Sequence, residues 1–226
     1  MTVLGVVPAR GGSKGVSGKN LRRLAGEPLL VHTLRSALAA TLLDRLVVST
    51  DDADIAAEAR AAGVEVVDRP AELATDTART EPVLLHAADA LAAADGVAAD
   101  WIVTLEPTSP LRTAALIDHC IALALREQPG AVITVTETRD NYGRREGDRF
   151  HYLFPGQPRR RQERQPLYRE SGTVYVTRAS ALRANGSVLA EPLLSVVVAD
   201  EEGIDLNTLL DFEVAEAVMR ARRESK

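Results

Sequence analysis

The feature that most constrains the fold is a regular alternation of short β-branched runs with longer Ala- and Leu-rich stretches of helical period. This alternation predicts strands over residues 3–7, 45–49, 64–67, 101–105 and 131–136, and helices over residues 29–40, 52–62, 80–94 and 113–126. Asp51 and Asp52 are candidates to cap the second helix. The intervals between strands are long enough for crossover helices, so an α/β fold with an open, doubly wound, mostly parallel sheet is predicted.

Composition and length narrow the class of protein further. With 226 residues, of which 46% are hydrophobic, the chain suits a single domain over residues 1–226. The first residues lack the pattern of a signal peptide, and no run has transmembrane length, which predicts a cytoplasmic protein without a membrane anchor. Cys120 is the only cysteine, so an internal disulfide and a cysteine zinc site are excluded and a packed thiol is expected. His32, His86, His119 and His151 have no matching ligand set, which argues against a histidine metal site.

The alternation of predicted strands and helices is interrupted by a basic segment at residues 138–169, which we call the arm. Between Arg139 and Arg169 it holds nine arginines against four acidic residues, interleaved with aromatic side chains. Nucleic-acid binding is one interpretation of this pattern. We favour a hairpin-like arm that packs on a partner subunit in a homodimer and offers arginines to an anionic ligand.

The chain after the arm returns to regular structure. The runs "TVYV" and "LLSVVV" predict further strands. The stretch "NTLLDFEVAEAVMRARR" predicts a terminal helix, and its period places Leu209, Phe212, Ala215 and Met219 on one face.

The loop after the first strand, "VVPARGGSKGVSGKN" at residues 6–20, carries three cations and no acid. It fails the Walker A pattern, because Ser13 stands where glycine is required and Asn20 follows the lysine, and its glycines also miss the G-x-G-x-x-G spacing. What remains is a glycine-rich turn whose amides could approach a polyphosphate, flanked by Arg10 and Lys19. The alternative is an ordinary solvated surface loop.

Several motifs resemble, in order, those of CMP-sialic acid synthetases (N-acylneuraminate cytidylyltransferases). They are "VVPARGGSKGVSGKNLRRLAGEPLLVHTLRSAL", "VVSTDD", "VVDRPAELATDTA", "LEPTSPLRT" and "GIDLNTLLDF". The resemblance implies a fold of the nucleotide-diphospho-sugar transferase type, a homodimer, a Mg²⁺ requirement, and the reaction of CTP with a nine-carbon 2-keto sugar acid to give a CMP-sugar and pyrophosphate. Such catalysis is mostly alignment and neutralisation of charge on phosphate oxygens.

The resemblance also assigns residues to the nucleotide. Arg10 and Lys19 would hold the triphosphate and stabilise the leaving pyrophosphate. Asn20 and the loop backbone would seat the nucleotide, the backbone positions being Ala9, Gly11, Gly12 and Ser13. Contacts to the cytidine would come from Arg69, the backbone near Ala78, and Thr80. A charged loop partner for Arg69 and helix capping for Thr80 are the structural alternatives.

The metal site implied by the resemblance departs from the family pattern. Where the family has two aspartates spaced as D-x-D, this chain has Asp205 and Asn207. In an extended segment both side chains would face one side. Asn207 could ligate Mg²⁺ through its carbonyl oxygen without adding charge, or could cap the last helix. Asp211 is interpreted as a helix-surface residue.

The sugar side holds two further departures. Glu106 replaces the family's glutamine in "QPTSP", and Ser171 replaces an asparagine. A carboxylate cannot donate a hydrogen bond, so Glu106 either faces a hydroxyl or amine of the sugar or is paired with arginine. Ser109 and Arg112 of "SPLR" would shape this region, Arg112 having a structural alternative. Arg164 and Arg169 are candidates for the sugar carboxylate, with salt bridges to Glu163 or Glu170 or solvent exposure as alternatives.

Three functions remain open from the sequence. The first is a cytidylyltransferase for a sialic, legionaminic, pseudaminic or deaminated nonulosonic acid. The second is a related enzyme that activates Kdo or another sugar acid, or uses another nucleotide. The third is a catalytically silent nucleotide-binding homologue.

Overall fold

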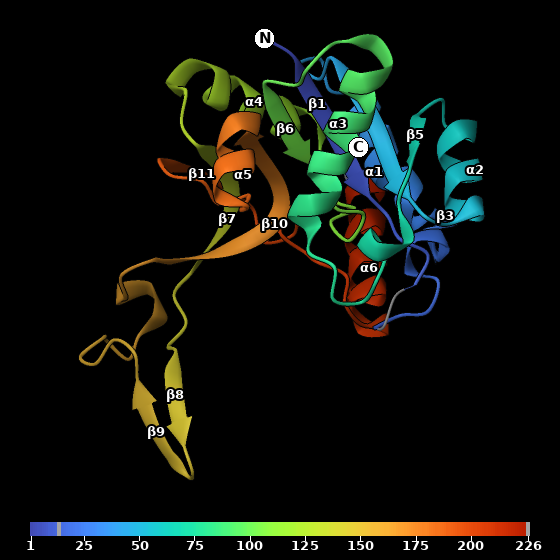
Figure 1. The fold of residues 1–226 in the computed structure, drawn as a ribbon. Coiled ribbons are helices and arrows are strands. Elements are labelled where there is room, and N and C mark those ends of the chain that lie inside the picture. The colour runs from blue at the N-terminus through green and yellow to red at the C-terminus, as the bar shows by residue number, and fades with distance from the viewer. Residues whose placement is uncertain (13–14, 225–226) are drawn as a thin grey trace.

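The structure is a computed structural model that describes residues 1–12 and 15–224. Helices pack on both faces of one central sheet (Figure 1). The sheet has seven strands in the order β11-β7-β10-β6-β1-β4-β5. Their bounds are β1 (Val3–Pro8), β4 (Arg45–Thr50), β5 (Glu65–Asp68), β6 (Trp101–Thr104), β7 (Ala131–Thr138), β10 (Leu167–Arg178) and β11 (Leu193–Val198). Neighbouring strands pair in parallel except β10, which is antiparallel to both β6 and β7. The predicted open, mostly parallel sheet is therefore confirmed.

The helices are distributed over both faces of the sheet, as a doubly wound topology requires. They are α1 (Leu29–Leu38), α2 (Ala53–Ala61), α3 (Thr80–Asp95), α4 (Ala114–Glu127), α5 (Ala179–Asn185) and α6 (Leu209–Glu224). Buried residues of α1, α2 and α4 share one hydrophobic core, and those of α3 and α5 share the core on the opposite face. The sequence did not predict α5 or the hairpin of β2 (Arg23–Leu24) and β3 (Glu27–Pro28), because such short elements leave little periodicity.

Side-chain alternation along β1 shows why these runs become central strands. Val3 and Val7 enter one core, while Leu4 and Val6 enter the other. A strand buried on both faces is expected to be apolar throughout, and this one is. Cys120 is buried in the first core, and burial raises the pKa of its thiol to about 12, so the expected packed thiol is confirmed.

The ends of two helices refine the sequence predictions. Asp52 caps α2 by accepting hydrogen bonds from the backbone N–H groups of Asp54 and Ile55, as predicted. In α6, Phe212 and Ala215 are buried as expected, but Leu209 is 53% exposed. The predicted face is thus buried at Phe212 and Ala215 but exposed at Leu209, which stands in the first turn of α6.

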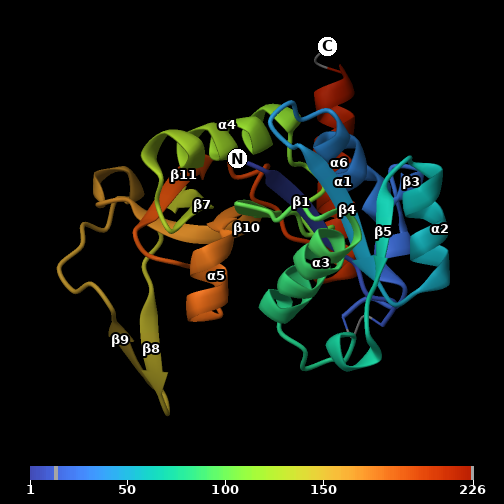
Figure 2. The ribbon, with the colours of Figure 1, turned by 45° about the horizontal axis from the view of Figure 1, so that its top comes forward.

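The arm leaves the sheet between β7 and β10 and projects away from it as a hairpin (Figures 1 and 2). It contains β8 (Gly143–Glu146) and β9 (Arg149–Tyr152), which pair with each other in a separate two-stranded sheet. Among the described residues, no helix combines the length and apolarity needed to cross a membrane.

Candidate active site

A cleft of about 270 Å³ opens where the loops after β1 and β6 meet the segment between β11 and α6. Ligands of open α/β sheets bind beyond the carboxyl ends of the strands, so this is the expected place. The lining residues come from all three segments and are Pro8, Arg10, Gly12, Lys19, Asn20, Glu106, Pro107, Thr108, Asp205 and Asn207. Both loop cations predicted to hold a polyphosphate thus line one cleft, together with Glu106 of the loop after β6 and Asp205 of the segment before α6.

The glycine loop is fixed by hydrogen bonds rather than left as free surface. The Arg10 guanidinium donates to Asp76 at 2.6 Å, and its backbone carbonyl accepts from the Asn20 amide at 3.0 Å. The Lys19 ammonium donates to the carbonyl of Leu206 at 2.7 Å. The backbone N–H of Gly11 donates to Asp51, a residue predicted as a helix cap that instead anchors this loop. Ser13 lies outside the described residues.

Two glycines of the loop allow close approaches that a larger residue would prevent. A Cβ at position 11 would lie 2.5 Å from a carboxylate oxygen of Asp52. A Cβ at position 15 would lie 2.8 Å from the backbone carbonyl of Asn207. Gly15 therefore permits contact between the loop and the segment that carries the predicted metal ligands.

A small hydrophobic cluster holds these two segments together. Val16 of the loop, Leu206 of the segment before α6, and Phe212 of α6 are all buried in it. Their packing sets how far the loop cations lie from the carboxylate of the neighbouring residue Asp205.

The residues predicted to contact the cytidine lie near the loop, but none lines the cleft. Arg69 is buried, and its guanidinium donates to the backbone carbonyl of Ser49 at 2.6 Å. Burial lowers the pKa of Arg69 to about 10. Thr80 is the first residue of α3, Ala78 donates its N–H to Thr75, and Ala9 is fully buried after β1. Their nucleotide roles stay predictions.

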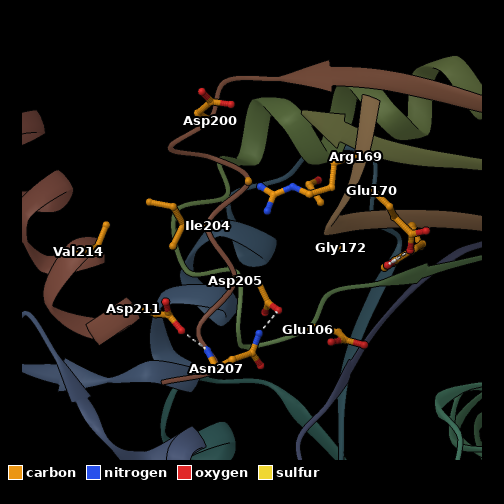
Figure 3. A pocket seen from close by; sticks show the side chains of 13 residues that line it. Glu106, Arg169, Glu170, Gly172, Asp200, Ile204, Asp205, Asn207, Asp211 and Val214 are labelled. Atoms are coloured by element: carbon orange, nitrogen blue, oxygen red, sulfur yellow. Dashed lines mark hydrogen bonds between the residues drawn. The ribbon is translucent and has the colours of Figure 1, made fainter. Parts of the chain in front are cut away.

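A second, larger cavity of about 500 Å³ adjoins the first (Figure 3). Three residues, Glu106, Asp205 and Asn207, line both cavities. The other residues lining the second cavity are Arg169, Glu170, Ser171, Gly172, Tyr175, Asp200, Gly203, Ile204, Asp211 and Val214. The site therefore has one compartment with two cations and one dominated by carboxylates, with three polar residues between them.

The segment before α6 confirms the predicted alternation of side chains. Leu206 is fully buried, while Asp205 and Asn207 on either side of it are exposed and face the cavities. The Asn207 amide donates to the Asp205 carboxylate at 2.6 Å (Figure 3). Both side chains predicted to hold the metal are thus brought together.

The start of α6 corrects the alternative interpretation of Asn207 as its cap. The Asp211 carboxylate accepts from the N–H of Asn207 and from the N–H and hydroxyl of Thr208, and the Thr208 hydroxyl accepts from the N–H of Asp211. Thr208 and Asp211 therefore form a reciprocal cap. Hydrogen bonds from Asn207 and Thr208 lower the pKa of Asp211, which is a capping residue rather than a plain surface one.

Glu106 follows β6, and its half-buried side chain lies at the boundary of the two cavities. Burial first, and then the nearby Asp205 carboxylate, raise the pKa of Glu106. The expectation of an arginine partner is not met, because Arg112 donates to the backbone carbonyl of Glu106 and not to its carboxylate.

Arg112 lies in the interior, which corrects its assignment to the sugar. Its guanidinium donates to the carbonyls of Thr173 and Glu106, at 2.5 and 2.8 Å, and it is 4% exposed. Burial lowers its pKa to about 9. Arg112 is therefore a structural clamp between β10 and the loop after β6. Ser109 is also buried, and its hydroxyl has no hydrogen-bond partner among the described residues.

The two arginines predicted for the sugar carboxylate lie in different places. Arg169 lines the larger cavity, with its Nε 3.4 Å from the Thr136 hydroxyl (Figure 3). Arg164 donates to three backbone carbonyls within the arm, those of Pro158, Arg159 and Arg139. It lines neither cavity of its own chain, because these bonds commit it to the arm's own fold, and its role at the sugar carboxylate stays a prediction.

Sequence reasoning missed Tyr175 and Glu170 as lining residues of the larger cavity. The Tyr175 hydroxyl donates to the Glu170 carboxylate, and burial followed by this bond raises the pKa of the phenol above its usual value. The β-bulge between Glu170 and Tyr175 turns both side chains toward the cavity. Ser171 is buried and bonded to Thr134, so its hydroxyl serves the strand network.

The sheet is open and doubly wound, and its first strand leads into a glycine loop whose cations share a cleft with the Asp205 carboxylate. This combination is typical of a nucleotidyltransferase. The chain belongs to the cytidylyltransferase family, because a family model described as "Cytidylyltransferase" matches residues 4–201. The predicted resemblance to CMP-sialic acid synthetases is confirmed by its relatives.

Relatives of known name cover the whole chain. It is 31% identical, over all of its length and 99% of the relative's, to the CMP-N,N'-diacetyllegionaminic acid synthase of Legionella pneumophila. It is 26% identical, over 99% of its length, to the N-acylneuraminate cytidylyltransferase of Escherichia coli. The chain spans about half of the latter protein, since it covers 54% of that sequence.

Two solved structures share the fold at low sequence identity. One is a CMP:2-keto-3-deoxy-manno-octonic acid synthetase complexed with CTP, with a TM-score of 0.72, 18% identity, and coverage of 98% of this chain and all of that one. The other is the 4-diphosphocytidyl-2C-methyl-D-erythritol synthase of Anaerococcus prevotii, with a TM-score of 0.68, 18% identity, and coverage of 97% and 96%. Both support the fold class alone.

Proposed function

We propose that this protein joins CTP to a nonulosonic acid, giving the CMP-sugar and pyrophosphate. The observation that carries the proposal is the pair of adjoining cavities, one lined by Arg10 and Lys19 and the other large enough for a sugar acid. The named relatives act on acids of this class, legionaminic and acylneuraminic among them. A pseudaminic acid cytidylyltransferase of Campylobacter jejuni is 25% identical over the whole chain.

The reaction places a defined demand on each compartment. The anomeric hydroxyl oxygen forms a bond to the α-phosphorus of CTP, and the bond from that phosphorus to the bridging oxygen breaks. Pyrophosphate leaves with the bonding electrons, and the hydroxyl proton passes to solvent. Arg10 and Lys19 would neutralise the charge that grows on the phosphate oxygens. Arg169, the only cation that lines the larger cavity among the described residues, would bind the sugar carboxylate.

A divalent cation fits the shared boundary of the cavities. The described residues contain no group of three His, Cys, Asp or Glu side chains arranged to hold a metal alone. Mg²⁺ sites commonly combine one or two carboxylates with substrate phosphates and water, so Asp205 would hold the ion together with bound CTP. When bound, Mg²⁺ supplies positive charge to the phosphate oxygens.

Pyrophosphate release across a panel of sugar acids tests this proposal. We expect turnover with CTP, Mg²⁺ and one or more of N-acetylneuraminic, legionaminic, pseudaminic or deaminated nonulosonic acids. Turnover only with Kdo, the substrate named for a relative 38% identical over 53% of this chain, would select the second function considered. Absence of turnover with every acid and nucleotide would select a catalytically silent homologue and end the proposal.

We further propose that the arm packs on a second copy of the chain, forming a homodimer. Its aromatic side chains are largely exposed: Phe150 and Tyr152 of β9 are 55% and 56% exposed and contact each other edge to face. Tyr142, Leu153 and Phe154 of the same arm are also exposed. Exposed patches of this kind typically mark association sites.

Charged substitutions on the outer surface of β9 should give monomers. Phe150→Glu with Tyr152→Glu would place two carboxylates in an apolar contact, so we expect the molar mass from light scattering after size-exclusion chromatography to fall to that of one chain. His151→Glu is the matched control, because His151 lies between them and faces the other side of the hairpin. A wild-type monomer, or a double variant that stays dimeric, would contradict this role of the arm.

A further inference from the structure

Glu106 is the one carboxylate at the boundary of the two cavities that has no partner. Within the described chain its carboxylate makes no hydrogen bond and no ion pair, and the half-buried side chain lines both cavities. An ionised carboxylate in such a place is costly unless a positive charge or hydrogen-bond donors meet it. A ligand that fills the cavities and displaces their water must therefore bring a positive charge or hydrogen-bond donors to this carboxylate.

The charged groups near Glu106 do not balance it. Asp205 and Glu170 are negative, and the two cations that act on it are Lys19 and Arg112. Both of these donate to backbone carbonyls, Lys19 to that of Leu206 and Arg112 to those of Thr173 and Glu106. Neither cation makes a hydrogen bond or an ion pair with the Glu106 carboxylate in the described part of the chain.

Backbone hydrogen bonds hold Glu106 beside Asp205. The N–H of Leu206 donates to the carbonyl of Thr108 at 2.9 Å, which joins the segment before α6 to the loop after β6. On the other side of this loop, Arg112 holds the carbonyl of Glu106. The two carboxylates therefore come from segments that are fixed to each other, and both line both cavities. Figure 3 shows them in the larger cavity.

We propose that Glu106 is the second carboxylate ligand of the divalent cation, and that it supplies across the cleft the charge which Asn207 does not supply within its own segment. This rests on the proposed function, because CTP completes the site. Asp205 with an amide brings one negative charge, whereas Asp205 with Glu106 brings two, the upper number common at Mg²⁺ sites. Asn207 then has a different part, since its amide donates to Asp205 and fixes the orientation of that carboxylate.

Mn²⁺ binding in the presence of CTP, without any sugar acid, tests this assignment by a readout that needs no turnover. The free Mn²⁺ signal in electron paramagnetic resonance gives the affinity of each variant. We expect Glu106→Gln to weaken Mn²⁺ binding by about 10- to 100-fold, the loss typical of removing groups that support a metal site. Asn207→Asp in the same chain should restore most of the affinity, because it returns a carboxylate to the site.

Glu170→Gln is the matched control for charge alone. Glu170 lies in the same cavity and acts on Glu106 through space, but its carboxylate is bonded to Tyr175. Its removal should cost a small fraction of what Glu106→Gln costs. Equal losses would mean that only the summed field matters and would overturn the assignment.

The remaining outcomes separate this inference from the proposed function. If Glu106→Gln binds Mn²⁺ as the wild type does but has a raised KM for the sugar acid, Glu106 recognises a sugar hydroxyl or amine and the assignment is wrong. If the wild-type protein binds no Mn²⁺ with CTP yet turns over, the assignment fails and the cytidylyltransferase proposal stands. Thermal unfolding of each variant shows whether its chain is folded. If Glu106→Gln alone is misfolded, the Mn²⁺ affinity of the Glu106→Gln/Asn207→Asp variant is compared with that of the wild type instead.

Discussion

Lys19→Ala is expected to lower the turnover number by about 10²- to 10³-fold, the effect typical of removing one charge-stabilising donor from an active site. The Lys19 ammonium lines the cleft beside Arg10 and is held there by the carbonyl of Leu206. It would meet the phosphate oxygens on which charge grows as pyrophosphate leaves. Initial rates of pyrophosphate release at saturating CTP, Mg²⁺ and sugar acid measure the loss.

Arg23→Ala is the control for charge in the same loop region. Arg23 donates to the carbonyl of Gly26 and does not line either cavity in the described chain, so its removal should leave the rate close to that of the wild type. Because Lys19 also ties two segments together, unfolding temperatures of both variants are needed. A Lys19→Ala protein that is folded and fully active would show that the loop is ordinary surface.

Arg112→Ala is expected to lower the free energy of unfolding by about 2 to 4 kcal/mol, since each buried carbonyl left without a donor costs about 1 to 3 kcal/mol. The carbonyl of Thr173 would lose its guanidinium donor, the carbonyl of Glu106 would keep only the Ser109 N–H at 3.3 Å, and the side chain would leave a cavity. Burial of the Arg112 guanidinium is itself costly, and it lowers the pKa of that group to about 9. Removing the guanidinium removes this cost and offsets part of the loss of stability. Urea denaturation followed by circular dichroism gives the value.

Arg126→Ala, in the last turn of α4, is the matched control. Arg126 is exposed and bonded only to its neighbour Glu127, so its loss should change stability by no more than about 0.5 kcal/mol. Equal stability of the two variants would contradict the clamp. If instead Arg112 contacted the sugar, the variant would keep its stability and show a raised KM for the acid alone.

Regular elements and the location of the site were accessible from the sequence, because both follow from local patterns. Strands buried on both faces appear in the sequence as apolar runs. The amphipathic helices between them show a helical period of apolar residues that can be recognised without knowledge of the tertiary structure. The glycine loop was predicted to follow the first strand, and the topology then required it to lie at the carboxyl edge of the sheet. The D-x-N spacing likewise predicted that Asp205 and Asn207 share a side, as they do.

What the sequence by itself determined is thus the order of the main strands and helices and the family, and it predicted the loop residues as candidates for the nucleotide. Only the tertiary structure decided that Arg112 is buried, that Arg164 serves the arm, and that Glu106 stands unpaired beside Asp205. The physical reason is that burial and pairing depend on groups distant in the chain. A local pattern fixes which way a side chain leaves the backbone, but the partner that meets it is set by the packing of the whole fold.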